Sequence, residues 1–436
     1  MTGRASEGAL PANGGRRAFP RQFWLLSGGI LVLLAGVDMC FPLETIYLTT
    51  RLHISATTVG LVLGLPILAS LPLHIVGGAF TDKYGRRPAM VIGISIITGL
   101  YLTFAFAGSL WPIALALAIE AGLGWAMFLT GSNAMIADLV VHERRGEAYA
   151  ITRVALNVGM VIGPLFARQL LSVDPTFRAV FLTGAALCAA FVVIVLTTFR
   201  ETRPAAAVAR HDSLLTTLKG YGVVLHDRRF LLFCGIVLLP LYGFGQLWSI
   251  FPVALQRQFG ISAGTWSSLL MTYALCGAVM QYPVVRLLRH RNPIVAMSIS
   301  SACLAVGLGG AVLAPWGRGT FGLMLILSLG VVILIPISAT VAAGLAPVAL
   351  RGRYMGAWTL VQMGGYALGP TFGGWALDGL GARRAFSLVG VLALTGSLLF
   401  ALNAKRLRPT AGETLDAVDE DDELDGEALA SIPPSV

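Results

Sequence analysis

The chain has 436 residues, of which 56% are hydrophobic and only 12% are charged, and its mean hydropathy is +0.78. Because soluble domains carry about 25% charged residues, this composition excludes a water-soluble enzyme and a disordered regulator. The net charge of +9 would indicate a nucleic-acid partner in a soluble protein, whereas in a membrane protein it reports topology.

Apolar stretches of about 20 residues, the length that crosses a bilayer as a helix, follow one another along most of the chain. We predict spans at 23–46, 57–80, 88–108, 112–138, 147–171, 177–199, 230–254, 264–288, 293–313, 320–345, 353–377 and 384–403. The expected fold class is therefore an all-α membrane protein with twelve transmembrane helices.

The Lys and Arg residues gather in alternate loops between these spans. With residues 1–22 in the cytoplasm, 23 basic residues fall on that side of the membrane and 7 on the other. Since cytoplasmic loops are enriched in Lys and Arg, we expect both termini in the cytoplasm and a multi-pass protein of the inner or plasma membrane. No cleavage site follows the first basic residues, so the first span is predicted to be a membrane helix rather than a signal peptide.

The longest interior polar stretch, residues 200–229, divides the predicted spans six and six. The expected organisation is a cytoplasmic segment 1–22, a first six-helix bundle 23–199, a linker 200–229, a second six-helix bundle 230–408 and a tail 409–436. Nine acidic residues lie between Glu413 and Glu427, so the tail is predicted to be disordered and cytoplasmic.

A segment of the first half recurs in the second half. Shifting residues 137–167 by 206 positions matches them to 343–373 without a gap, with an Arg-Gly pair and a G-x-x-x-G-P pattern in each copy. The pattern consists of Gly159, Gly163 and Pro164 in the first copy and of Gly365, Gly369 and Pro370 in the second. Small residues four apart let helices approach closely, and parallel six-helix repeats are a transporter architecture. We therefore expect two pseudo-symmetric bundles.

Three of the charged residues inside predicted spans of the first half are candidates for a functional site. Asp38 precedes Pro42 by four residues, Glu120 lies at a similar predicted depth, and Arg153 is in the fifth span. A charge inside a bilayer is costly and marks a functional site by default, and a carboxyl taken out of water binds a proton more readily. The coupling candidates are Asp38, Glu120 and Arg153; we expect the two carboxyls to share one cavity and Arg153 to supply a positive charge. Hydration of Asp38 near the outer surface, and snorkelling of Arg153 towards the cytoplasm, are the alternatives.

The predicted spans of the second half carry aromatic and amide side chains and no acidic residue. The candidates for lining a substrate cavity are Tyr242, Gln246, Trp248, Tyr273 and Gln362. An apolar pocket with a few such groups suits amphipathic or cationic organic molecules better than sugars. Packing against lipid or at the membrane interface is the alternative for any single aromatic residue.

The sequence lacks several catalytic and cofactor-binding patterns. It has no G-x-x-x-x-G-K-S/T loop and no His/Cys/Glu cluster with metal-ligand spacing, and its five cysteines are scattered through apolar segments. We therefore expect a protein that is not an enzyme, does not use ATP, and binds no cofactor and no metal.

The loop between the second and third predicted spans reads G-A-F-T-D-K-Y-G-R-R. It resembles the signature G-x-x-x-D-x-x-G-R-R/K of the major facilitator superfamily. The matching residues are Gly78, Asp82, Gly85, Arg86 and Arg87, and Asp138 at the end of the fourth span is the expected partner of the arginines. Asp82 can sit at a helix N-terminus, and Gly85 permits a tight turn. The resemblance implies that this network stabilises the outward-facing state; simple positive-inside anchoring is the alternative.

Within this superfamily, the G-M-V-I-G-P pattern from Gly159 to Pro164 and the position of Asp38 resemble those of twelve-helix drug:proton antiporters. The family's intramembrane arginine of the fourth helix is absent, since Ala118 stands at that position. The resemblance implies alternating access and proton-coupled efflux of amphipathic or cationic molecules by a monomer. Its partners would be a small-molecule substrate, protons and the lipid bilayer, with no nucleic acid. Two alternatives stay open: movement of a metabolite or lysolipid by symport or facilitated diffusion, and a receptor or scaffold that uses the acidic tail.

Overall fold

The computed structural model describes residues 19–141, 144–202, 223–288, 291–313, 315, 317–347 and 350–408. Every regular element in these ranges is a helix. The predicted acidic tail, most of the linker and most of the N-terminal segment lie outside the described residues, so the predicted disorder of the tail stays a prediction.

Eight helical elements form the first half of the chain, where long apolar runs favour helices that satisfy their own backbone hydrogen bonds. They are α1 (Arg21–Thr50), α2 (Ala56–Tyr84), α3 (Arg86–Phe106), α4 (Leu110–Ile119), the π-helix η1 (Glu120–Gly124), α5 (Trp125–Leu139), α6 (Arg145–Val173) and α7 (Arg178–Thr198). The chain runs from α4 through η1 into α5 without a break, so one long helix carries a single π-helical turn at Glu120.

The second half is built in the same way. Its elements are α9 (Arg228–Leu247), α10 (Ile250–Phe259), α11 (Ala263–Leu288), α12 (Pro293–Leu304), the π-helix η3 (Ala305–Gly309), α13 (Gly310–Leu313), α14 (Arg318–Leu345) and α15 (Arg351–Leu402). The predicted span 230–254 is two helices, because the chain leaves helical geometry at Trp248 and Ser249. Gly381, with φ 77° and ψ 164°, likewise divides α15 into two helices.

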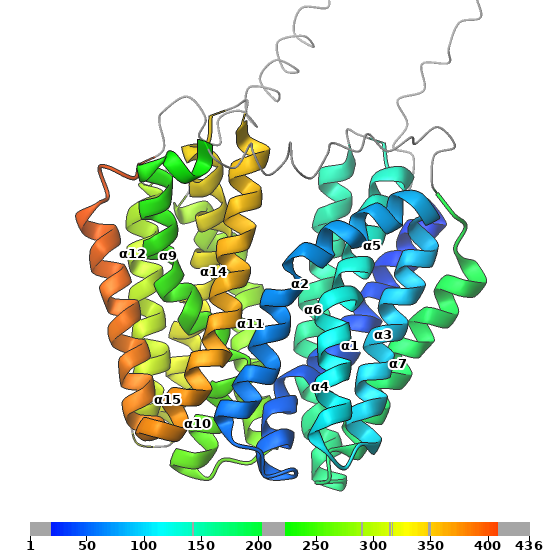
Figure 1. The fold of residues 1–436 in the computed structure, drawn as a ribbon, viewed down its shortest axis with the longest axis horizontal. Helices are drawn as coiled ribbons and strands as arrows, with labels where there is room; N and C mark the ends of the chain where they lie inside the picture. Colours follow the sequence, from blue (N-terminus) through cyan, green and yellow to red (C-terminus); the bar gives the residue numbers. More distant parts are fainter. Residues whose placement is uncertain are drawn as a thin grey trace, which may run out of the picture.

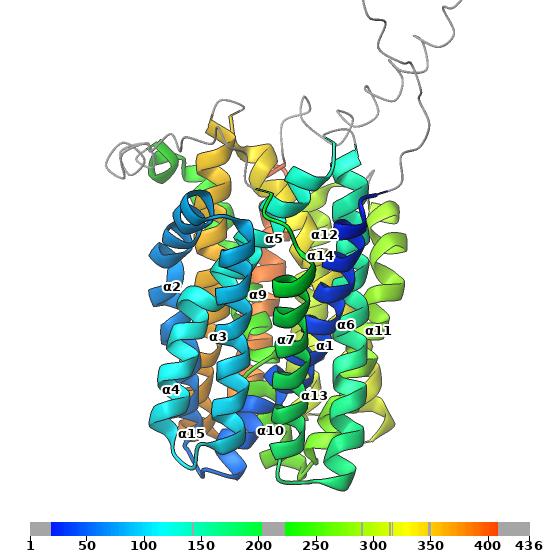
Figure 2. The same cartoon turned by 90° about the vertical axis from the view of Figure 1, so that its right-hand side faces the viewer.

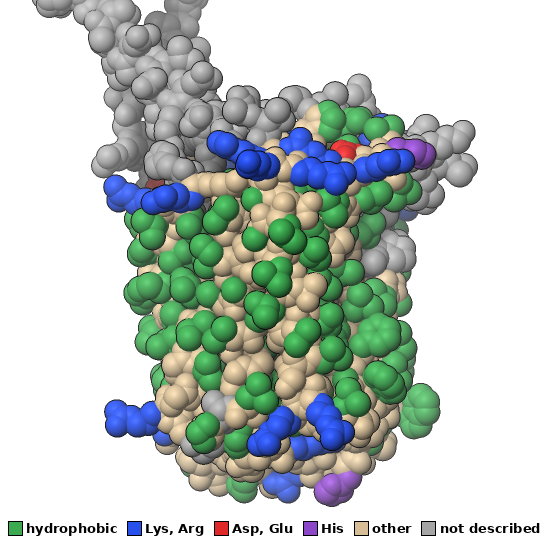
Figure 3. Space-filling view, turned by 90° about the vertical axis from the view of Figure 1, so that its left-hand side faces the viewer, with side chains coloured by type: hydrophobic (Ala, Val, Ile, Leu, Met, Phe, Trp, Pro, Cys, Tyr) green, Lys and Arg blue, Asp and Glu red, His purple; other side chains and the backbone are tan. Residues whose placement is uncertain are grey.

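Ten helices in the described ranges are long and apolar enough to cross a membrane, and Ala56–Ser70 within α2 is a shorter apolar stretch. The helix α15 counts once among the ten, although Gly381 divides it. The side of the molecule in Figure 3 carries hydrophobic side chains over its middle and Lys and Arg at its two ends. This is the distribution expected of a protein with a belt of lipid around it.

The helices form two groups that stand side by side, α1 to α7 in one and α9 to α15 in the other (Figure 1). Most of the long helices run nearly parallel to a common axis (Figure 2). We call the end of the molecule that holds Arg21, Tyr84, Leu288 and Leu402 the terminal face, and the end that holds Thr50, Ala56, Val173 and Gly381 the opposite face. The predicted domain boundaries remain predictions, although this grouping places α1 to α7 apart from α9 to α15.

The two copies of the internal repeat pack in equivalent ways. A Cβ atom at Gly163 of α6 would lie 2.7 Å from the backbone nitrogen of Met39 in α1. A Cβ atom at Gly369 of α15 would lie 2.7 Å from the carbonyl carbon of Gly245 in α9. Since Met39 and Gly245 are themselves 206 positions apart, the shift that aligns the glycine helices also aligns the helices they pack against.

Candidate functional site

The two helix groups meet along a seam that involves α1, α2 and α6 on one side and α10, α11 and α15 on the other. Near the opposite face the seam is tight, because Cβ atoms at Gly60 and Gly64 of α2 would overlap the carbonyl oxygens of Pro370 and Ala367 in α15. In α11, Trp266 is fully buried and its Nε1 donates a hydrogen bond of 3.2 Å to the carbonyl oxygen of Pro42 in α1. The close approach of α2 to α15 and the hydrogen bond of Trp266 hold the two groups together at the opposite face.

A carboxylate also crosses the seam at this face. Oδ2 of Asp378 accepts hydrogen bonds from the backbone nitrogen of Thr57 (2.7 Å) and from its hydroxyl (2.8 Å). Oδ1 of Asp378 pairs with the guanidinium of Arg257 at 2.7 Å. Because Thr57 is in the first turn of α2, the negative charge sits where the helix has unpaired N–H groups.

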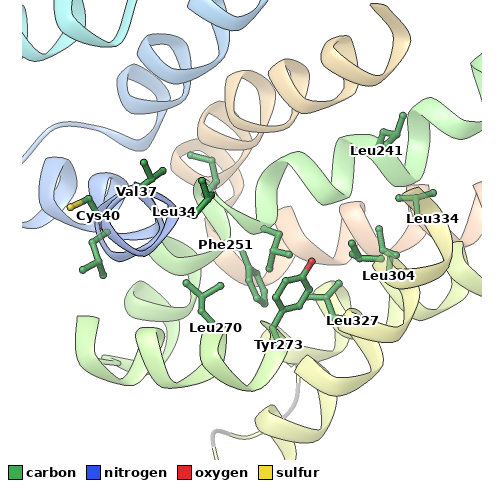
Figure 4. Packing of buried hydrophobic residues seen from close by; sticks show 14 of the residues in the cluster. Leu34, Val37, Cys40, Leu241, Phe251, Leu270, Tyr273, Leu304, Leu327 and Leu334 are labelled. Carbon is green, nitrogen blue, oxygen red and sulfur yellow. The ribbon is translucent and has the colours of Figure 1, made fainter. Parts of the chain in front are cut away.

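Aromatic residues of the second group meet α1 at the seam. Trp248 lies at the break between α9 and α10, with its ring centroid 5.7 Å from that of Tyr273 in α11 and nearly perpendicular to it. On its other side, Trp248 lies 6.2 Å from the ring of Phe41 in α1. Figure 4 shows Tyr273 beside Leu327, close to Leu270 and Phe251. The structure thus brings two of the predicted cavity residues together, and adds Phe41, which the sequence analysis did not select.

The other three predicted cavity residues do not take part in the aromatic contacts around Trp248. Gln362 donates a hydrogen bond of 3.1 Å to the hydroxyl of Tyr366, one turn along α15. Gln246 is buried in α9 against α15, where a Cβ atom at Gly373 would lie 2.7 Å from its Oε1. Tyr242 is one turn before Gln246 and is partly buried. Gln246 therefore packs between helices of its own group.

Asp38 is on the same face of α1 as Phe41, one turn away. It is 9% exposed, and its Oδ2 accepts no hydrogen bond from any described residue. A Cβ atom at Gly163 of α6 would lie 2.8 Å from the carbonyl carbon of Asp38, so the glycine face of α6 packs directly against this turn of α1. A buried, unpaired carboxyl thus lies one helical turn from the ring that contacts Trp248.

The other two charged candidates lie on other helices. Glu120 is partly buried in η1. Glu44 is only 1% exposed and falls inside the first predicted span, but it was not among the candidates predicted from the sequence. Arg153 is exposed on α6, one turn before Asn157, whose amide lies 3.5 Å from the amide oxygen of Gln281 across the seam.

The signature loop lies at the terminal face. Gly85, with φ 111°, makes the turn between α2 and α3, a backbone conformation that residues with a side chain rarely adopt. Arg86 pairs with Asp138 through Nε and Oδ2 at 3.0 Å, and the hydroxyl of Thr202 donates to the same oxygen at 3.1 Å. These contacts join α3, the end of α5 and the residues after α7, all within the first helix group.

The acid at the N-terminus of α3 is Glu201. Its carboxylate oxygens accept from the backbone nitrogens of Arg86 (2.9 Å) and Arg87 (3.0 Å). Asp82, which we expected to be able to take a place at a helix N-terminus, lies in the last turns of α2. The side chain of Asp82 and the surroundings of Gly78 lie outside the described part of the chain. Glu201 was missed because it is 115 residues from Arg86 in sequence.

A cavity of about 570 Å³ opens beside the seam at the opposite face, between α6, α11 and α14. Its lining includes Arg168, Ser172, Ser262, Thr265 and Phe321. None of the predicted site residues lines it, so it is separate from the aromatic contacts around Trp248.

The sequence matches the family described as the Major Facilitator Superfamily over residues 26–329 and 241–429. Among its relatives, the multidrug resistance protein MdtH of Klebsiella pneumoniae (strain 342) is 30% identical over 374 residues, covering 82% of this chain and 86% of the relative. The protein of the same name from Escherichia coli O9:H4 (strain HS) is 28% identical over 369 residues, with the same coverage of both chains.

Solved structures with the same fold are more distant in sequence. A POT family transporter in complex with 5-aminolevulinic acid has a TM-score of 0.72 and 16% identity, covering 90% of this chain and 98% of its own. A bacterial homologue of the human lysosomal transporter Spinster, inward-facing and unoccupied, has a TM-score of 0.70 and 15% identity, covering 89% and 98%. At these identities the similarity shows a shared fold.

Proposed function

Because this chain belongs to the major facilitator superfamily, a family of membrane transporters and not enzymes, we propose that it exports amphipathic or cationic organic molecules in exchange for protons. The observation that carries the proposal is the position of Asp38. Its carboxyl is buried without a hydrogen-bond partner for Oδ2, one turn from the contact between Phe41 and Trp248. The names of the relatives MdtH support a drug-like substrate.

The chemistry of this seam suits a cation with an apolar body. The faces of Trp248 and Tyr273 attract a cationic group, and an ionised Asp38 would supply the counter-charge. A proton that binds Asp38 neutralises this charge and weakens the hold on the cation. Exchange of proton for substrate at one carboxyl would couple the two fluxes, because binding of either favours release of the other.

We further propose twelve membrane spans. The count follows if α2 crosses the membrane once and α15 crosses it twice, with the turn at Gly381. The terminal face would be cytoplasmic, as the distribution of Lys and Arg favours. The contacts at Trp266 and Asp378 would then close the outward path, and substrate would reach Trp248 from the cytoplasm.

Transport by everted vesicles tests the proposal. Wild-type vesicles should accumulate a fluorescent cationic dye, and collapse of the pH gradient should abolish this accumulation. Asp38→Asn should abolish it as well, whereas Glu147→Gln, which removes an exposed carboxylate of the terminal face, should not. Accumulation that persists without a pH gradient would contradict proton coupling, and full activity of Asp38→Asn would contradict the site.

The two alternative functions are distinguished by related measurements. Export of a metabolite or lysolipid, and not of dyes, in a substrate panel would favour the first alternative. Deletion of residues 409–436 would abolish the biological effect of a receptor or scaffold, but should leave dye export intact if the protein is the proposed exporter.

A further inference from the structure

Basic residues at the terminal face of the first helix group have acidic partners within that group. Nε of Arg86 lies 3.0 Å from Oδ2 of Asp138, which joins α3 to the end of α5. Nη2 of Arg144 lies 2.8 Å from Oε2 of Glu147, at the start of α6. These positive charges are therefore balanced inside the fold of the first group.

The second helix group has few acids with which to balance its basic residues. Residues 223–408 contain two acidic residues, Asp227 and Asp378. Asp378 pairs with Arg257 at the opposite face. At the start of α9, Oδ1 of Asp227 accepts from two backbone nitrogens at 2.9 and 3.0 Å, and its Oδ2 accepts from the hydroxyl of Tyr354 at 2.9 Å. Both carboxylates of the second group are thus occupied by contacts other than ion pairs with the described basic residues of the terminal face.

Three chain segments meet at the terminal face of the second group. The guanidinium of Arg229, at the start of α9, donates to the carbonyl oxygen of Arg408. The side-chain amide of Asn292, at the start of α12, donates to the carbonyl oxygen of Ala404 at 3.4 Å. Figure 3 faces this helix group and shows Lys and Arg side chains along its terminal end. We call the exposed basic residues of these three segments the basic surface; they are Arg228, Arg291, Lys405, Arg406 and Arg408.

The charge of the basic surface has no counterpart in the described part of the chain. None of its five residues forms an ion pair with a described residue. Like charges on one surface repel one another, and their summed field attracts a partner with several negative charges. A polyanion therefore fits the basic surface better than a single small anion does.

An acidic segment of the same chain begins at this surface. The described residues end at Arg408, which belongs to the basic surface, and nine acidic residues lie between Glu413 and Glu427. A random coil of the 19 residues that separate Arg408 from Glu427 spans about 25 Å, so these acids remain within reach of the surface. Because they are attached to it, their effective concentration there is high. A lipid headgroup or a separate acidic protein does not have this advantage.

We propose that the acidic segment of residues 413–427 docks on the basic surface of its own chain. The docked segment balances the positive charge that the fold leaves unpaired, and it shields this surface from acidic lipid headgroups. Single exposed ion pairs are weak and are screened by salt, so docking depends on several charges together and not on one residue. The inference goes beyond the proposed function and does not rest on it, because docking requires neither substrate nor a proton gradient.

The mobility of a spin label on the acidic segment tests the docking. The label is attached at Val418→Cys in the full-length protein without other cysteines, in a neutral detergent that supplies no acidic lipid. In about 0.1 M salt we expect a slowly moving label. In about 1 M salt, where the Debye length falls from about 10 Å to about 3 Å, the label should move several-fold faster.

Charge reversal on the folded part of the chain identifies the surface that holds the segment. Arg228→Glu combined with Arg291→Glu should free the label at low salt. Arg383→Glu combined with Arg384→Glu is the matched control, because it reverses two exposed arginines of the same helix group at the opposite face. The net charge changes equally in both variants, and only the first should raise the mobility of the label.

Charge reversal on the acidic segment gives an independent test. Glu420→Lys combined with Glu423→Lys should free the label when the basic surface is unchanged. The same change should slow the label again in the variant with Arg228→Glu and Arg291→Glu, since attraction between the two regions is restored. Thermal melting verifies that the surface variant is folded, and the segment variant provides the test if it is not.

Three results would overturn the docking. The label could be equally mobile at both salt concentrations, or the opposite-face variant could free it as much as the terminal-face variant does. The terminal-face variant could also lower the binding of phosphatidylglycerol and leave the label unchanged, which would assign the basic surface to acidic lipids instead.

Discussion

Thr57 and Asp378 bind each other across the seam, with the carboxylate of the second helix group at the first turn of α2 in the first group. Both the backbone nitrogen and the hydroxyl of Thr57 donate to Oδ2, and Arg257 of α10 holds the other carboxylate oxygen. Three helices, α2, α10 and α15, therefore share one carboxylate. This residue therefore joins the two helix groups at the opposite face, in addition to the backbone packing there.

Replacing Asp378 by Asn should favour opening of the opposite face. The Arg257 pair is part-exposed and contributes less than about 1 kcal/mol, while the contact with the α2 N-terminus contributes about 1 kcal/mol. Their loss should shift the equilibrium roughly tenfold towards the open arrangement. Spin labels at 173 and 313, in a background without free cysteines, would report the distance between the two groups. Glu147→Gln removes an exposed carboxylate of the terminal face and should leave that distance unchanged.

Gly60→Ala should have a similar effect through packing. The added Cβ would overlap the carbonyl oxygen of Pro370, a backbone atom that cannot turn aside. Overpacking of this kind costs about 1–3 kcal/mol, more than the helix propensity of about 1 kcal/mol that Ala gains over Gly. Gly99→Ala is the control, because nothing lies within 4 Å of a Cβ at that position of α3. Equal melting temperatures and label distances in the two variants would contradict the tight seam.

Glu201→Ala should destabilise the terminal face of the first helix group. The change leaves two backbone N–H groups at the start of α3 without their acceptor, at a cost of about 1 kcal/mol. Thermal melting of purified protein measures this cost. Glu147→Ala removes an exposed acid that pairs with Arg144 on one helix turn, and the smaller contribution of such a pair should give a smaller change. The assignment fails if the two variants melt alike.

Asp174 should make the stability of the turn between α6 and α7, at the opposite face, sensitive to acid. Hydrogen bonds from the hydroxyl and backbone nitrogen of Thr176 lower the pKa of this carboxyl below its ordinary value of 3.8. A lowered pKa stabilises the folded state above the ordinary value, and this stabilisation is lost as the pH falls through the folded-state pKa. The difference in melting temperature between wild type and Asp174→Asn should therefore shrink in acid below pH 3.8. A difference in melting temperature that stays constant as the pH falls would contradict this role of Asp174.

The order of the helices and the repeat were predictable because both follow from local patterns. Apolar length predicts a helix wherever it occurs, and Gly159 and Gly365 stand at equivalent positions in the sequence. The contact of Arg86 with Asp138 was expected from residue types at the ends of neighbouring spans. The break at Trp248 has a signal that the predicted span 230–254 did not use, because Pro252 has no N–H to donate to the carbonyl oxygen of residue 248.

The neighbours of the acidic residues could not be predicted from the sequence, for a different reason. Depth along a helix can be counted, so Asp38 and Glu120 were expected to meet at similar depth. Which neighbour a helix face meets depends on how α1 and α3 are rotated against each other, which a single sequence does not specify. Glu44 is buried although it was not selected, and Glu201 lies at the N-terminus of α3 through a contact distant in sequence.

The pseudo-symmetry of the repeat makes a prediction with internal controls. Gly163→Ala and Gly369→Ala should each lower the melting temperature by a similar amount, because in both cases the new Cβ would lie 2.7 Å from the backbone of the partner helix. Crowding against backbone costs about 1–3 kcal/mol. Gly146→Ala and Gly352→Ala are also related by the 206-residue shift, and nothing lies within 4 Å of a Cβ at either position. These control variants should melt at or above the wild-type temperature, since Ala favours a helix by about 1 kcal/mol over Gly. A large effect in one half and none in the other would show that the two packing faces are not equivalent.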